Sequence, residues 1–174
     1  ALSHAQHFCA AGLAAAFRPH LRYFCVRAAE KTYNQRLKVQ LLRELACEEN
    51  VVEVAAELAE YSHESQGVLA CEAVHALGTL ASRFPACAGE ALKRLQLHLR
   101  AAKPALLPAL LAAFAELLPQ LHTAPDELAR AVEAAAEEAA EDELFDALLQ
   151  VLCAAGQRLP RSAYVFEKLV DSVL

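Results

Sequence analysis

The segment LKVQLLRELACEENVVEVAAELAEYS, residues 37–62, contains two amphipathic patterns in direct succession. Within each pattern apolar residues recur three or four positions apart: Leu37, Leu41 and Leu45 in the first, and Val51, Val54 and Leu58 in the second. This spacing places them on one face of an α-helix. We therefore predict helices at 34–47 and 51–62 that form an antiparallel hairpin.

Helical periodicity continues on both sides of this hairpin, and no stretch alternates as a half-buried strand does. Prolines stand where one helix should end or the next begin: Pro19, Pro85, Pro104, Pro125 and Pro160. The predicted helices are 3–17, 19–27, 34–47, 51–62, 66–84, 86–100, 105–118, 125–140, 143–156 and 161–173. Pro108 lies in the first turn of one of them, where a missing N–H costs little.

Three residue pairs have the spacing of a capping box, in which an N-cap oxygen and an acceptor three residues later satisfy backbone amides. They are Thr32 with Gln35, Asn50 with Glu53, and Thr123 with Asp126. These pairs predict helix starts independently of the apolar periodicity.

The predicted helices pair into hairpins that restart every roughly 30–40 residues, close to the period of HEAT and armadillo repeats. The second hairpin joins 66–84 to 86–100. The predicted fold class is all-α, an α-solenoid of stacked antiparallel helix pairs. The helix at 105–118 is apolar nearly all round, as expected between layers. Five leucines are predicted to be buried: Leu41, Leu45, Leu58, Leu77 and Leu95.

Length and composition predict one helical segment over residues 1–174, cut from a longer protein. The chain starts at Ala1 without a signal-peptide pattern. Apolar residues occur near both ends: Phe8, Leu13, Phe17, Phe166, Leu169, Val170 and Val173. Because solenoids need polar terminal repeats, we expect further layers to cover these residues and the isolated chain to self-associate.

The longest nearly apolar run, 105–115, is shorter than the roughly 20 residues that a transmembrane helix needs. The six cysteines stand far apart and form no Cys-x-x-Cys pair. We interpret them as free, buried thiols in a reducing cytosol.

The net charge of −6 averages over separate blocks. A basic group comprises Arg18, Arg22, Arg27, Lys31, Arg36, Lys38 and Arg43. An acidic block at 44–64 follows, then basic residues from Arg83 to Lys103 and acidic residues from Glu116 to Asp146. We interpret the blocks as solvated faces that pair across neighbouring repeats. A membrane-facing role of the basic group is the alternative, since clustered cations attract anionic head groups. Aromatic residues are too sparse for nucleic-acid stacking.

No residue group predicts catalysis, a cofactor or a metal. His4, His7 and Cys9 could supply metal ligands, but the others would have to come from distant helices. His63-Glu64 lacks the second histidine of a zinc-protease helix, because Gly67 stands there. His75 is interpreted as packed between layers. The acids Glu137, Glu138, Glu141, Asp142 and Glu143 are interpreted as a charged helix face.

Five short motifs follow one another at a familiar spacing: Phe24-Cys25-Val26-Arg27, Leu37-Lys38, Asn50-Val51-Val52, Glu57-Leu58-Ala59-Glu60-Tyr61 and Ala73-Val74-His75-Ala76-Leu77-Gly78. In this order the chain resembles the beta subunits of heterotetrameric clathrin adaptor complexes, from Phe24 to Leu99 and most strongly within 17–121. The segment 17–21 looks most like the beta subunit of the third adaptor complex.

The resemblance implies a non-catalytic trunk segment that binds the medium and second large adaptor subunits. It also implies a cytoplasmic protein, peripheral to Golgi and endosomal membranes, that sorts cargo into vesicles, without cofactors or nucleic acid. One departure stands out: Gln150 replaces a Trp common in beta subunits, and Cys153-Ala154 replace Gly-Glu. No partner-binding residue can therefore be carried over. The alternative is a HEAT or armadillo scaffold of another class, a transport receptor or phosphatase regulator.

Overall fold

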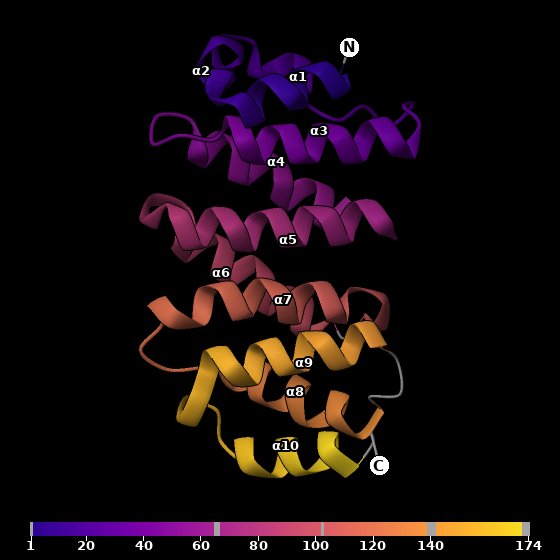
Figure 1. Ribbon diagram of the computed structural model, residues 1–174, viewed down its shortest axis with the longest axis vertical. Coiled ribbons are helices and arrows are strands. Elements are labelled where there is room, and N and C mark those ends of the chain that lie inside the picture. Colours follow the sequence, from indigo (N-terminus) through magenta and orange to yellow (C-terminus); the bar gives the residue numbers. More distant parts are fainter. Residues whose placement is uncertain (1, 65–66, 102, 139–141, 172–174) are drawn as a thin grey trace. The chain divides into compact units, whose positions relative to one another are not determined.

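The structure is a computed structural model that describes residues 2–64, 67–101, 103–138 and 142–171, and within these ranges it contains helices and no strand (Figure 1). The α-helices are α1 (Leu2–Phe8), α2 (Ala14–Phe17), α3 (Thr32–Leu45), α4 (Val51–Glu64), α5 (Val68–Arg83), α6 (Pro85–Arg100), α7 (Leu107–Leu117), α8 (Asp126–Glu138), α9 (Asp142–Ala155) and α10 (Ser162–Asp171). Short π- and 3₁₀-helical turns connect some of them: η1 (Cys9–Leu13), η2 (Arg18–Phe24), η3 (Pro104–Leu106), η4 (Leu118–Gln120) and η5 (Gly156–Arg158).

The chain forms two compact units, Ala1–Ala91 and Leu92–Leu174, and α6 crosses the boundary between them. In the first unit α3 packs between α1 and α5, and α4 packs against α5. In the second unit α7 packs against α9, while α8 contacts both α9 and α10. Each unit is thus an all-α stack of antiparallel helix pairs, which confirms the predicted fold class. The prediction of a single segment over 1–174 stays a prediction.

The five leucines predicted to be buried are buried: Leu41, Leu45, Leu58, Leu77 and Leu95 each expose at most 1% of their surface. The hairpin of α3 and α4 lies within the first unit, as predicted. The second predicted hairpin joins α5 to α6 across the unit boundary and stays a prediction. On α7 the fully buried Phe114 and Leu111 occupy the core of the second unit, consistent with the apolar character of this helix.

The N-terminal helices were predicted wrongly. The predicted helix 3–17 is broken at Gly12, whose φ of +86° lies outside the helical region and is accessible to Gly at little cost. The predicted helix 19–27 is the 3₁₀ turn η2, which begins at Arg18 and is followed by non-helical residues from Cys25 to Lys31. Alanine-rich sequence here gives no strong apolar stripe, so the break at Gly12 decides the geometry.

The remaining helices agree with the prediction to within a few residues. The first turn of the predicted helix 105–118 is the 3₁₀ turn η3, and Pro108 lies in the first turn of α7 as predicted. The predicted ends at 66, 139–140 and 172–173, with Glu141 and Val173, lie outside the described residues.

The three capping boxes do not form as predicted. Thr32 is the first residue of α3, and Lys31 is its N-cap. The Asn50 side-chain oxygen accepts a hydrogen bond from Cys47 N–H at 2.7 Å, so it closes the preceding turn. The Pro125 carbonyl accepts the first helical bond of α8, from Ala129 N–H, which places Thr123 outside the N-cap position.

Candidate functional site

A polar cluster fastens the loop 25–31 to α3 in the first unit. Lys38 is 6% exposed, and its Nζ donates to the Cys25 carbonyl at 2.9 Å and to Glu30 Oε1 at 2.7 Å. The hydrogen bond from Lys38 lowers the pKa of the Glu30 carboxyl. Because an isolated buried ammonium is costly, the pairing with Glu30 is what allows Lys38 to be buried.

The same loop is held to α4 by Tyr61. Its hydroxyl accepts a hydrogen bond from Val26 N–H at 2.9 Å and donates to Glu57 Oε2 at 2.7 Å. Burial, followed by the hydrogen bond to Glu57, raises the pKa of the phenol. A neutral donor is therefore maintained at this position.

Three of the motifs that carry the resemblance meet in this cluster. They are 24–27 in the loop, 37–38 on α3 and 57–61 on α4. Their polar members hold backbone and one another in place, so these motifs specify the packing of the first repeat.

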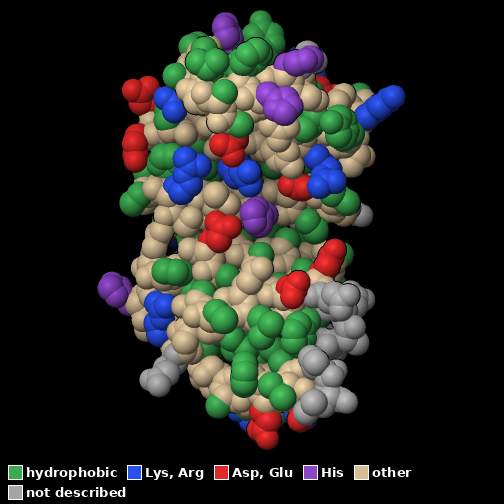
Figure 2. All heavy atoms as spheres, viewed as in Figure 1, with side chains coloured by type: hydrophobic (Ala, Val, Ile, Leu, Met, Phe, Trp, Pro, Cys, Tyr) green, Lys and Arg blue, Asp and Glu red, His purple; other side chains and the backbone are tan. Residues whose placement is uncertain are grey.

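The basic group is distributed over several environments. Lys38 is buried, Arg36 donates from Nε to Glu72 Oε1 at 3.0 Å, and Arg43 contacts Glu44 at 3.3 Å. Its other four members are exposed: Arg18, Arg22, Arg27 and Lys31. In Figure 2 acidic and basic side chains alternate on the face that carries α5. The Arg36–Glu72 pair joins α3 to α5, although Glu72 lies outside the acidic block 44–64. Pairing between the blocks and a membrane-facing role both stay predictions.

The histidines and acids considered for chemistry are separated. His4, His7 and His63 are exposed, Cys9 is buried and His75 is half-buried on α5. Burial raises the pKa of the Cys9 thiol. Glu137 and Glu143 are exposed. Within the described part of the chain, no three His, Cys, Asp or Glu side chains form a group suited to a metal ion.

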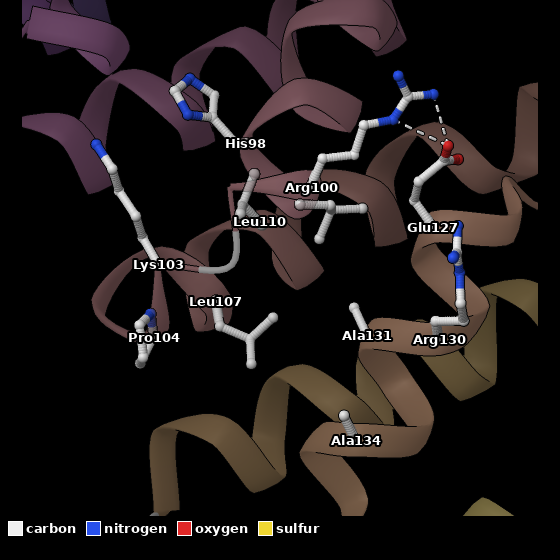
Figure 3. A pocket seen from close by; sticks show the side chains of 11 residues that line it. His98, Arg100, Lys103, Pro104, Leu107, Leu110, Glu127, Arg130, Ala131 and Ala134 are labelled. Carbon is white, nitrogen blue, oxygen red and sulfur yellow. Dashed lines mark hydrogen bonds and ion pairs between the residues drawn. The ribbon is translucent and has the colours of Figure 1, made fainter.

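A groove in the second unit was not predicted from the sequence. It encloses about 460 Å³ between the C-terminal end of α6, the turn after it, α7 and α8 (Figure 3). Lys103, Arg100 and Arg130 lie at its edges, and Leu107, Leu110 and Ala131 line its interior. Arg100 donates from Nε and Nη2 to Glu127 Oε1 at 3.1 and 2.7 Å, and this hydrogen bond lowers the pKa of the Glu127 carboxyl. No sequence motif marks this groove, because its lining residues are spread over 37 positions, 98–134, with ordinary helical spacing.

Arg158 is a second residue whose role the sequence did not predict. Its guanidinium donates to the carbonyls of Leu118 and Leu121 at 2.7 and 3.0 Å, and to those of Ala154 and Ala155 at 2.7 and 3.2 Å. It therefore satisfies backbone acceptors at the C-terminal ends of both α7 and α9.

The departure from the family pattern lies on α9. Gln150 and Cys153 are exposed there, and Figure 2 shows hydrophobic side chains gathered over this helix. The sequence change therefore alters the surface and leaves the packed face, with Leu148 and Val151, apolar and fully buried.

These features define the class: an all-α protein of stacked helix pairs whose distinctive polar residues hold its helices together. Among the described residues no helix is long and apolar enough to cross a membrane. No family model and no solved structure matches the chain. Over 69 residues it is 30% identical to a protein described as AP-3 complex subunit beta from Dictyostelium discoideum, a match that covers 40% of this chain and 6% of that protein. This partial similarity supports an adaptin-like relationship for one segment of the chain.

Proposed function

We propose that this chain is a non-catalytic scaffold segment of a vesicle-coat adaptor large subunit. The observation that carries the proposal is the 69-residue similarity to an AP-3 complex beta subunit. The stacked helix pairs support it, because such stacks present extended surfaces to partner proteins. The clustering of the resemblance motifs around Lys38 and Tyr61 supports it further, since shared packing residues favour a shared repeat structure.

The proposal includes a position and partners. The chain belongs to a longer trunk that binds a medium and a second large adaptor subunit. It works in the cytoplasm, on Golgi or endosomal membranes, as part of a coat that sorts cargo. It reaches the membrane through the complex.

Affinity purification tests the proposal. The protein is tagged at its own chromosomal locus, recovered under mild conditions and analysed by mass spectrometry. We expect a medium and a second large adaptor subunit in stable proportion with the tagged protein. Recovery of transport-receptor cargo or a phosphatase catalytic subunit in their place would identify a helical scaffold of another class and contradict the adaptor role.

A further inference from the structure

The groove in the second unit combines an excess of positive charge with an apolar interior. Three cations line it, Arg100, Lys103 and Arg130, against one carboxylate, Glu127. Glu127 is already engaged by Arg100. The local field therefore favours an anionic ligand, although the whole chain carries a net charge of −6.

The interior of the groove is recessed and apolar. Leu107 and Leu110 come from α7, and Ala131 and Ala134 from α8 (Figure 3). Alanines on α8 leave space opposite the α7 leucines. The volume of about 460 Å³ lies within the range of sites that take compact ligands or anchoring side chains.

The side-chain cations, and not the N-terminal end of α8, make the groove electrostatically complementary to an anion. Asp126 and Glu127 occupy the first turn of α8, where they interact with its positive dipole end. Because these two acids already occupy the end of α8, an incoming carboxylate is attracted to the side chains of Lys103 and Arg130. Both are exposed at the edges of the groove.

We propose that this groove binds an acidic peptide segment of a partner protein that inserts an apolar side chain between α7 and α8. Its Asp or Glu residues lie against Lys103 and Arg130, and its apolar anchor contacts the half-buried Leu107 and Ala131. A bilayer surface meets the edge cations but does not reach the recessed interior, whereas a side chain of an extended peptide does. The inference stands apart from the adaptor role, because it rests on the second unit alone.

The test measures fluorescence anisotropy of labelled synthetic peptides with the purified full chain. The probe has one central leucine flanked on both sides by glutamates. Matched peptides replace the glutamates with glutamines or the leucine with serine. We expect the probe to bind, each matched peptide to bind at least about fivefold more weakly, and added salt to weaken probe binding.

Variants locate the binding site. Lys103→Glu combined with Arg130→Glu should weaken probe binding at least about tenfold, since it converts attraction at the edges into repulsion. Ala134→Phe, at an exposed position, should weaken it by filling the groove. The control, Arg22→Glu with Lys31→Glu, makes the same charge change at exposed residues of the first unit and should leave affinity within about twofold. Circular dichroism and melting curves establish that each variant is folded.

Three outcomes would overturn the inference. One is an acidic probe that does not bind, and another is equal loss of affinity in the groove variant and its control. The third is binding to phosphatidylserine-containing vesicles, lost in the groove variant, without peptide binding, which would assign the cations to a lipid surface.

Discussion

At the residue scale, Lys38 and Tyr61 show how polar side chains specify a helical stack that apolar burial alone leaves underdetermined. Both lie at helical spacing from buried apolar residues, Lys38 from Leu41 and Leu45 on α3 and Tyr61 from Leu58 on α4, yet both reach back to the loop 25–31. Tyr61 accepts from Val26 N–H and Lys38 donates to the Cys25 carbonyl, so each side chain satisfies one backbone group of this loop. The loop is thereby fixed in position against α3 and α4.

Tyr61→Phe tests this role. The substitution keeps the ring but leaves Val26 N–H without its acceptor, so we expect the free energy of unfolding to fall by about 1–2 kcal/mol. Tyr33→Phe removes the same hydroxyl from a ring that is 65% exposed, and should change stability by less than about 0.5 kcal/mol. Urea denaturation measures both, and equal effects would show that the Tyr61 hydroxyl is not a structural group.

Glu30 should make stability depend on pH. Its carboxyl has a lowered pKa in the folded chain because Lys38 donates to it, so its stabilising contribution is present above the unfolded pKa of about 4.3. The contribution is lost as pH falls through the lower, folded value. We expect Glu30→Gln to be less stable by about 1 kcal/mol at neutral pH, a figure reduced for partial exposure of the carboxylate. The stability difference between the unchanged chain and Glu30→Gln should disappear at acidic pH. A difference that persists there would contradict an ionised Glu30 paired with Lys38.

At the element scale, local sequence predicted the long helices and failed where geometry depends on distant residues. The helices α3 to α6 have clear apolar stripes, so their ends were predicted to within a few residues and the five leucines were correctly predicted to be buried. The break at Gly12 could not be predicted, because glycine is tolerated in a helix and only packing decides whether its backbone leaves the helical region. Lys38 was predicted to belong to a solvated basic face. Its burial arises from contact with the loop 25–31, which local sequence does not reveal. The groove and Arg158 depend on contacts between separate helices and leave no local signal.

The contrast between Gly12 and Gly89 tests the helix break. Apart from adjacent residues and the nearby backbone of its own helix, neither glycine has a neighbouring atom within 4 Å of where a Cβ would lie, so backbone conformation distinguishes them. At Gly12, with φ of +86°, alanine should lower the free energy of unfolding by about 1 kcal/mol. At Gly89, inside α6, alanine should raise it by about 0.5–1 kcal/mol. Thermal unfolding of the two variants gives the sign of each change in stability. Stabilisation by Gly12→Ala would contradict the helix break and favour the continuous helix predicted at 3–17.

Arg158 joins the ends of two helices through four carbonyl groups. Arg158→Met should lower the free energy of unfolding by about 2 kcal/mol, since four carbonyls, two of them in half-buried hydrogen bonds, lose a charged donor. Arg158→Lys should rescue only part of this loss, because an ammonium cannot span the same acceptors. As a control, Arg161→Met removes an exposed ion pair with Glu133 and should cost less than about 1 kcal/mol. Equal costs at the two positions would refute the capping role.

At the scale of the whole molecule, cysteines report on the packing of each unit, five of them in the first and Cys153 in the second. None of the six cysteines is joined in a disulfide: Cys9, Cys25, Cys47, Cys71, Cys87 and Cys153. This agrees with the prediction of thiols that are not paired with one another. The prediction that they are buried is wrong for Cys153, which lies on the exposed side of α9, and only partly right for Cys25, Cys47 and Cys71. Self-association, which exposed Phe8 and Phe166 would promote, stays a prediction.

Pulsed alkylation followed by peptide mass spectrometry should separate these thiols. Cys153 in the second unit should react without denaturant, whereas Cys87 in the first unit should react at least about a hundredfold more slowly. Cys87 is 3% exposed, its Sγ donates to the Phe84 carbonyl at 3.4 Å, and burial raises the pKa of its thiol, which lowers the reactive thiolate fraction. Urea should accelerate Cys87 labelling in step with the loss of helical signal from the first unit, because only unfolding exposes this sulfur. Labelling of Cys87 as fast as Cys153 in native buffer would mean that the first unit lacks the packed core described above.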